Sequence, residues 1–242
     1  MPNVIVTKID EDAGPLQAQL AVRAHQQTID RSRDGQWLAL RALRDGSPVV
    51  APWHQALVFE GLVFCITVGA FSTGIAGGGA TAPISAVRPQ FTVAMPTGQS
   101  MLPIHVGMQV QVEVIVADND EAEALLAADR TQAVTTGTAT EETIFSMRTD
   151  HRVGSSATAR SAYSGDTPAL TIDIELDRVF LNADVQGTAA TALWTPLKLD
   201  YSPAVAPVLV GPATLLGFFG GTNTKSGFAQ VVWAELPTSA FT

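Results

Sequence analysis

The chain has 242 residues, of which 46% are hydrophobic and only 15% are charged. This composition excludes a disordered chain, which would be poorer in apolar residues and richer in charge. The balance of 14 Lys and Arg against 23 Asp and Glu gives a net charge of -9. That charge disfavours a general nucleic-acid binder, because phosphate contacts need clustered cations. The single cysteine, Cys65, excludes an internal disulfide framework and a zinc site built from several cysteines.

The N-terminal residues 1–35 are the most charged part of the chain and are predicted to form an arm or an edge segment. They lack a basic segment followed by an uninterrupted apolar stretch, so no secretory signal is expected. Residues 36–242 show no linker and are predicted to form one domain. The uncharged stretch 201–224 is long enough to span a bilayer, but three prolines interrupt it, which favours strands and turns over a membrane helix.

The first half of this domain contains several predicted strands. Residues 57–59, 62–68 and 91–95 are rich in β-branched and aromatic side chains, which is typical of strands. Residues 109–116 alternate valine with polar side chains, the pattern of a half-buried strand. The acidic residues 118–121 then precede an Ala/Leu run at 122–128, which predicts a short helix because carboxylates complement a helix start.

The second half of this domain also contains predicted strands. Residues 170–177 alternate, with Leu and Ile predicted to point inward and Asp and Glu outward. Residues 215–219 and 228–234 predict two strands, and the turn-forming residues between them predict a terminal hairpin. Many short strands and one short helix predict an all-β fold, an antiparallel β-sandwich of the jelly-roll type.

The segment 185–234 has only three charged residues, Lys198, Asp200 and Lys225. Such an apolar surplus indicates either a surface for a partner, most simply another copy of the chain, or the core half of the sandwich. Large aromatic side chains dominate the energetics of interfaces. The candidate interface residues are therefore Trp194, Phe218, Phe219, Phe228 and Trp233.

A search for catalytic chemistry finds no residue set that carries it. The four histidines, at positions 25, 54, 105 and 151, lack the spacing of a metal motif. The glycine-rich stretch 74–80 is not followed by the Lys-Ser/Thr of a phosphate-binding loop and predicts a loop tip. Cys65 lies within an apolar strand and is expected to be a buried hydrophobe. No catalytic, cofactor-binding or metal-binding residue is predicted, and the chain is not expected to be an enzyme.

Two acidic groups need a separate comment. The cluster at 118–121 could suggest calcium, but the sixth and twelfth positions of an EF-hand loop would hold Glu123 and Asp129 in place of glycine and glutamate. The acidic residues Asp173, Glu175 and Asp177 alternate with apolar ones. They predict a solvated sheet face, which is a more ordinary arrangement than a pair of catalytic acids.

Two parts of the sequence carry a resemblance to a known family. They are FTVAMPTG at 91–98, continued by LPI at 102–104 and VQV at 110–112, and PVLVGPATL at 207–215 with GGT at 220–222 and QVVWAEL at 230–236. In style and spacing they resemble the small β-sandwich structural proteins of tailed-phage virions. The resemblance implies a jelly-roll decoration or cement protein that binds a major capsid protein, often as a homotrimer. It also implies assembly in the host cytoplasm and no catalytic residues.

Three alternatives stay open. A jelly-roll chain could be the major capsid protein itself. It could also be a tail receptor-binding or carbohydrate-binding module, with exposed aromatic side chains beside the loop tips 74–80 and 154–166. An enzyme of the cupin kind would need a metal-binding histidine cluster.

Overall fold

The structure is a computed structural model. It describes residues 52–70, 73–77, 84–85, 87–114, 119–135, 137–150, 154–164, 170–184, 193–221 and 225–240. The predicted N-terminal arm, residues 1–35, and the predicted domain boundary that follows it lie outside these ranges. The strands belong to the compact unit Leu57–Thr242.

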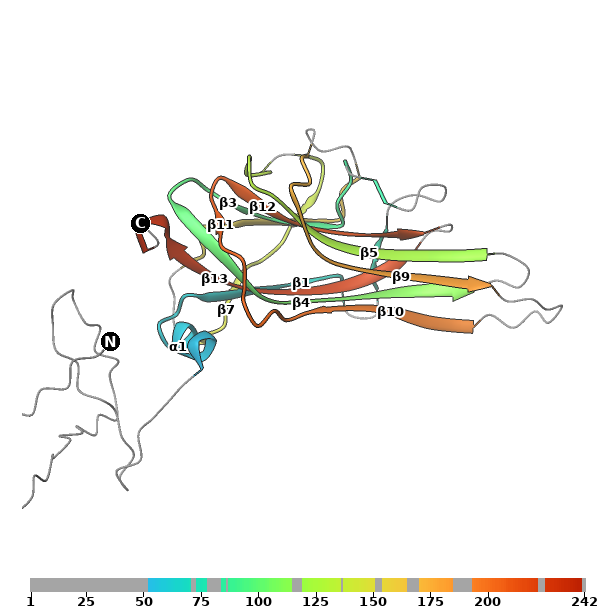
Figure 1. Cartoon of the computed structure of the whole chain (residues 1–242), viewed down its shortest axis with the longest axis horizontal. Helices are drawn as coiled ribbons and strands as arrows, with labels where there is room; N and C mark the ends of the chain where they lie inside the picture. The colour runs from blue at the N-terminus through green and yellow to red at the C-terminus, as the bar shows by residue number, and fades with distance from the viewer. Residues whose placement is uncertain are drawn as a thin grey trace, which may run out of the picture. The chain divides into compact units, whose positions relative to one another are not determined.

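The strands form two antiparallel sheets that pack face to face, so the predicted β-sandwich is confirmed (Figure 1). The first sheet has the order β10 (Leu193–Tyr201), β4 (Gln99–Val114), β13 (Ser226–Pro237), β1 (Val63–Val68) and β7 (Phe145–Ser146). Two short strands extend it, since β11 (Leu209–Val210) pairs with β4 and β2 (Ile75–Ala76) pairs with β13. The second sheet has the order β6 (Thr140–Glu141), β8 (Thr158–Ser161), β3 (Phe91–Met95), β12 (Ala213–Gly221), β5 (Asn119–Asp129) and β9 (Ile174–Asp184).

The strand pairing is nested along the chain. β5 pairs with β9, β4 with β10, β3 with β12 and β1 with β13, so each pair encloses the previous one in sequence. Successive pairs alternate between the two sheets. The main strands therefore follow the path of one long two-stranded ribbon that is folded back and forth between the two layers.

The main core lies between the sheets. It contains Phe91, Phe219 and Trp233, together with Met108 and Val110 of β4. On the same strand Gln109 and Gln111 are exposed, so the predicted alternation is confirmed up to residue 111. Beyond that point the side chains of residues 112–120 lie outside the described part of the chain.

The helix prediction was wrong in its position. Residues 122–128 belong to β5, because its small and aliphatic side chains are buried on both faces of the second sheet. The α-helix that the structure describes is α1 (Trp53–Phe59), and it includes residues 57–59, which the sequence predicted as a strand. α1 ends in a Schellman arrangement. The amide of Gly61 (φ 74°) bonds the carbonyl of Val58, and the amide of Leu62 bonds that of Leu57.

The terminal hairpin prediction was also wrong. β12 pairs with β3 and β5, whereas β13 pairs with β1 and β4 in the opposite sheet. The turn-forming residues between them therefore connect two layers. Both strands gain two partners in this way, which a two-stranded hairpin would not give them.

The third correction concerns residues 170–177. β9 begins only at Ile174, and a register shift opposite Leu126 and Ala127 separates Glu175 from Asp177. Ile172 consequently packs on the outer side of the second sheet, whereas Leu176 packs against the main core. The predicted single acidic face does not form, because the bulge reverses the alternation.

Two further apolar clusters cover the outer faces of the sandwich. On the second sheet, Leu216 and Phe218 pack with neighbours of β5 beneath Ile84, Leu170 and Ile172. On the first sheet, Val63, Val232 and Ala234 pack beneath Leu57 and Val58 of α1. Together with the main core, these clusters take up much of the apolar content of 185–234, which supports the interpretation of this segment as core. No helix among the described residues is long and apolar enough to cross a bilayer.

Candidate functional site

Three of the predicted interface aromatics are interior residues. Phe218, Phe219 and Trp233 each have 0% of their surface exposed. Phe219 and Trp233 belong to the main core, and Phe218 belongs to the outer cluster of the second sheet. The interface prediction was therefore wrong for these three, because a side chain buried within its own subunit cannot provide contact area to another.

The two remaining candidates differ. Phe228 is half-buried on β13, on the outer side of the first sheet, next to Gln109 of β4 in the register. The backbone of Trp194 lies in β10 opposite Glu113, and its side chain lies outside the described part of the chain. Only Phe228 is thus placed at the surface.

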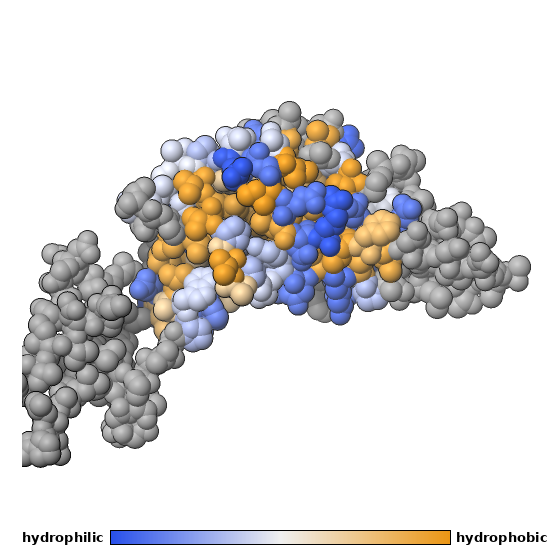
Figure 2. All heavy atoms as spheres, viewed as in Figure 1, coloured by the Kyte–Doolittle hydropathy of each residue, from blue (hydrophilic) through white to orange (hydrophobic). Residues whose placement is uncertain are grey.

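Other large apolar side chains do reach the surface. On the face drawn in Figure 2, hydrophobic residues reach the surface in several places around a hydrophilic group. Among the described residues, the exposed large apolar ones are Trp53, Phe59, Phe145, Met147, Phe180, Val205, Val208 and Val210. Sequence reasoning looked for large aromatic side chains in the apolar segment 185–234. Five of the exposed residues lie outside that segment, and the three inside it are valines.

Three of these residues lie at one margin of the first sheet, and we call Phe59, Phe145 and Met147 the apolar edge. β7 is the last strand of this sheet, where Phe145 pairs with Cys65 of β1, and the amide of Met147 donates to the carbonyl of Val63 at 2.9 Å. The guanidinium of Arg148 donates to the carbonyl of Phe59 at 2.7 Å, so α1 and the segment after β7 are fastened together. The apolar edge is exposed by 43–58%.

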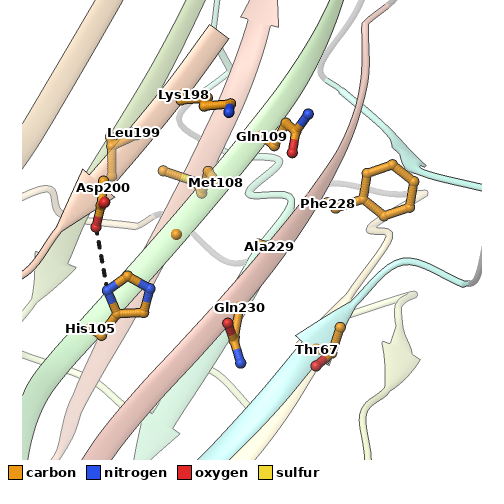
Figure 3. A pocket seen from close by; sticks show the side chains of 11 residues that line it. Thr67, His105, Met108, Gln109, Lys198, Leu199, Asp200, Phe228, Ala229 and Gln230 are labelled. Carbon is orange, nitrogen blue, oxygen red and sulfur yellow. Dashed lines mark ion pairs between the residues drawn. The ribbon is translucent and has the colours of Figure 1, made fainter. Parts of the chain in front are cut away.

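A groove crosses the outer face of the first sheet, beyond the cluster that α1 covers. It is open to solvent, has a volume of about 450 Å³ and is lined by residues of β1, β4, β10 and β13. Figure 3 shows its polar side chains, among them His105, Gln109, Lys198, Asp200 and Gln230, with the ring of Phe228 at one side. Cys65 and Thr67 of β1 both point to this outer side. Cys65 packs in the apolar cluster beneath α1 and Thr67 lines the groove, so this face of the sheet changes from apolar to polar along the strand.

Gly107 lies at the centre of the groove. It pairs with Asp200 of β10 on one side and with Gln230 of β13 on the other, and Gln230 in turn pairs with Thr67 of β1. These four residues therefore form one row across the sheet. A Cβ atom at this position would lie only 3.3 Å from Nε2 of His105. Glycine often marks a place where another group approaches the backbone closely, and here that group is the imidazole of His105. The absent side chain leaves a hollow in this row of polar side chains, which the imidazole partly fills.

A β-bulge orients His105 into the groove. Val232 pairs with His105 and Trp233 with Pro103, so Ile104 is an extra residue on β4. Ile104 packs in the outer cluster and His105 lines the groove, so two consecutive residues point to the same outer side. Bulges re-aim side chains in this way and are over-represented next to functional sites.

The groove carries nearly balanced charge. Nδ1 of His105 lies 3.4 Å from Oδ1 of Asp200, whose side chain is 77% exposed, and Lys198 supplies one cation. Such an exposed pair contributes at most about 1 kcal/mol to stability. The groove therefore offers hydrogen-bond donors and acceptors without a strongly positive or strongly negative electrostatic potential.

The described residues bring together no group of three His, Cys, Asp or Glu side chains that could hold a metal ion. His25 and His151 lie outside the part of the chain that the structure describes. Burial raises the pKa of the Cys65 thiol, which keeps it protonated, and Cys65 packs in the cluster beneath α1. Near the loop tip 154–166, Tyr163 is half-buried and its hydroxyl shares a 2.7 Å hydrogen bond with Thr92.

The residues that carry the resemblance to virion proteins fall in β3, β4, β11, β12 and β13, on both sheets. Comparison with family models, with curated proteins and with solved structures finds no match for this chain. The resemblance therefore stays a prediction.

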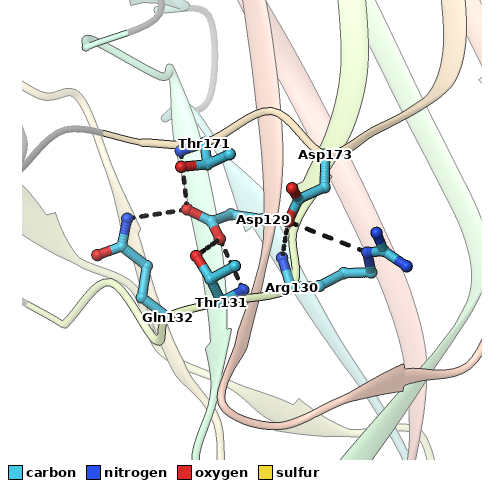
Figure 4. Close-up of polar contacts among 6 residues, drawn as sticks. All are labelled: Asp129, Arg130, Thr131, Gln132, Thr171 and Asp173. Carbon is cyan, nitrogen blue, oxygen red and sulfur yellow. Dashed lines mark hydrogen bonds and ion pairs between the residues drawn. The ribbon is translucent and has the colours of Figure 1, made fainter.

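Two acidic residues, Asp129 and Asp173, have structural roles at one end of the second sheet. The buried carboxylate of Asp129 accepts hydrogen bonds from the amide and hydroxyl of Thr131, from Gln132 and from the amide of Thr171, at 2.6–2.9 Å (Figure 4). Asp173 accepts a hydrogen bond from the amide of Arg130 at 2.9 Å. The two carboxylates thus fasten the segment before β9 to the end of β5.

Proposed function

We propose that this chain is a virion structural protein, a jelly-roll subunit that associates with copies of itself and decorates or cements a capsid shell. The observation that carries the proposal is the nested strand pairing. The four main strands of the first sheet have the order β10-β4-β13-β1, and those of the second sheet have the order β9-β5-β12-β3. A ribbon folded between two layers in this way supports a jelly-roll assignment, and viral capsid proteins are among the main users of that architecture.

The apolar edge supports self-association. Its three side chains are large and flexible or aromatic, the kinds enriched in interface cores. They lie on and beside the short edge strand β7, and an uncovered edge strand invites uncontrolled pairing with other chains. A closed oligomer, with a trimer as the expected form, would cover this surface in a defined way.

The charge of the chain favours a position outside the shell. A net charge of -9 repels nucleic-acid phosphates, so a lining in contact with a packaged genome is disfavoured. A decoration protein contacts the shell and other copies of itself, and it needs no cationic surface. The alternative of a jelly-roll major capsid protein predicts that the isolated chain forms closed shells by itself.

We expect the double substitution of Phe145→Asp and Met147→Asp to dissociate the oligomer into monomers at micromolar concentration. Two carboxylates in a buried contact would lose their hydration without gaining partners, which costs several kcal/mol. Light scattering coupled to size exclusion measures the molar mass. Because both side chains are already exposed, the melting temperature of the monomer should change little.

Phe180→Asp is the matched control, since Phe180 is 56% exposed on β9 of the other sheet. It should leave the molar mass unchanged. A wild-type chain that is monomeric at all concentrations and does not bind capsid shells would contradict the proposed function. Closed shells in electron micrographs of the isolated protein would instead favour the major capsid protein.

A further inference from the structure

We propose that the groove around Gly107 is a binding site for a neutral carbohydrate chain. The inference is independent of the virion proposal, because it rests on the outer face of the first sheet and not on the apolar edge. It also differs from the expected position of a carbohydrate site, which the sequence placed at the loop tips 74–80 and 154–166.

The size and shape of the groove suit a small segment of an extended ligand. Its volume of about 450 Å³ falls in the range of small-molecule sites. The groove runs across four strands and rests on a rigid sheet, so its side chains are placed by backbone hydrogen bonds rather than by a loop. The hollow at Gly107 lies in the middle of a row of polar groups, and the imidazole of His105 partly fills it, so a ligand that enters the hollow would contact this ring.

The hydrogen-bonding groups suit sugar hydroxyls. The amides of Gln109 and Gln230 both donate and accept, Asp200 accepts and Lys198 donates. A sugar hydroxyl also donates and accepts, so adjacent hydroxyls can satisfy such a mixed set. One carboxylate beside one ammonium gives neither the cationic cluster that a phosphate or sulfate needs nor the oxygen-rich set that a divalent cation needs.

Phe228 supplies the apolar surface that a sugar ring needs. Its ring rests against the backbone of Gly69, where an added Cβ would come within 2.8 Å of Cδ1. The ring is therefore held beside the polar row, next to Gln109 in the register (Figure 3). The C–H face of a pyranose can pack on such a ring while its hydroxyls reach the amides.

The test uses the full chain and a panel of neutral hexasaccharides built from glucose, mannose or galactose, with a sulfated hexasaccharide as the charged comparison. Saturation-transfer NMR and calorimetry measure binding. We expect at least one neutral hexasaccharide to bind with a Kd between about 10 µM and 1 mM, the range of a shallow, open site. Gly107→Val, which fills the hollow, and Phe228→Ala should each weaken binding about tenfold or more.

The controls are matched in residue type and exposure. Phe180→Ala removes an exposed aromatic ring from the opposite sheet, and Gln111→Ala removes an exposed amide of β4 beyond the groove lining. Both should bind like the wild type. Asp200→Asn and Gln230→Ala provide a second set if Phe228→Ala fails to fold, and each should weaken binding several-fold.

Three outcomes would overturn the inference. They are no binding of any neutral hexasaccharide at 10 mM, stronger binding of the sulfated one, and binding that is unchanged in all four groove variants. Molar masses measured on the same samples keep this result apart from the virion proposal, since groove variants should not change the oligomer and the substitution at residues 145 and 147 should not change sugar binding.

Discussion

Trp233→Ala is expected to lower the free energy of unfolding by about 3–5 kcal/mol, the cost of removing a large side chain from a packed core. Trp233 is fully buried and lies beside Phe64, with ring centroids 6.4 Å apart. Its indole N–H also donates to the carboxylate of Glu235 at 2.9 Å. A loss of this size is a large share of the 5–15 kcal/mol that a typical domain has. Urea unfolding followed by fluorescence or circular dichroism measures it.

Two further variants separate the contribution of the buried volume from that of the hydrogen bond and provide a control at an exposed site. Trp233→Phe keeps most of the volume but removes the indole donor, and it should cost about 1–2 kcal/mol. Phe180→Ala, at an exposed site, should stay within about 0.5 kcal/mol of the wild type. If Trp233→Ala instead kept full stability and changed only the molar mass, Trp233 would be an interface residue and the core described above would be wrong.

Asp129→Asn is expected to destabilise the fold by about 3 kcal/mol at pH 7. An asparagine amide would present N–H donors to Gln132 or to the amide of Thr171, which are themselves donors, and the charge-assisted bonds would be lost. The segment before β9 would then be held less firmly. Leu170 and Ile172 lie in this segment and cover Phe218, so their packing would also weaken. Asp150→Asn, which weakens an exposed surface pair with Arg148, should cost less than about 1 kcal/mol.

The effect of Asp129 depends on pH in a defined direction. Burial by itself would raise the pKa of Asp129, but its hydrogen bonds with Thr131, Gln132 and Thr171 outweigh burial and lower it below 3.8. A carboxyl whose folded pKa is lowered stabilises the fold fully above its unfolded pKa, and this contribution is lost as the pH falls through the folded value. The gap between wild type and Asp129→Asn should therefore be constant above about pH 5 and shrink below pH 4. A gap that grew in acid would contradict this assignment.

The fold class could be predicted from the sequence because period-two alternation survives in strands with one solvated face, as at Gln109 and Gln111. The Ala/Leu run of β5 could not be assigned in this way. Both of its faces are buried, so the alternation disappears and only helix propensity remains. The pairing of β12 and β13 with strands far away in sequence also left no local signal. The turn residues between them suit a connection between layers as well as a hairpin.

The candidate site was largely missed for a related reason. Phe218, Phe219 and Trp233 were chosen because aromatics in an uncharged segment suggest an interface, yet they fill two separate clusters of the fold. The groove depends on a bulge at Ile104 and on the register of four strands. Neither can be read from spacing along the chain. Gly107, a glycine within a strand, was the one signal that could have indicated it.

The nested strand pairing sets an order for synthesis and folding. The innermost pair, β5 with β9, can form while the ribosome is still making the rest, and each pair that closes shortens the loop that the next must close. β1 is made first among these strands, but its partner β13 is made last. The partner strand of its Phe64 and Ile66 is therefore absent until β13 has been made, and this is the period in which aggregation competes with folding.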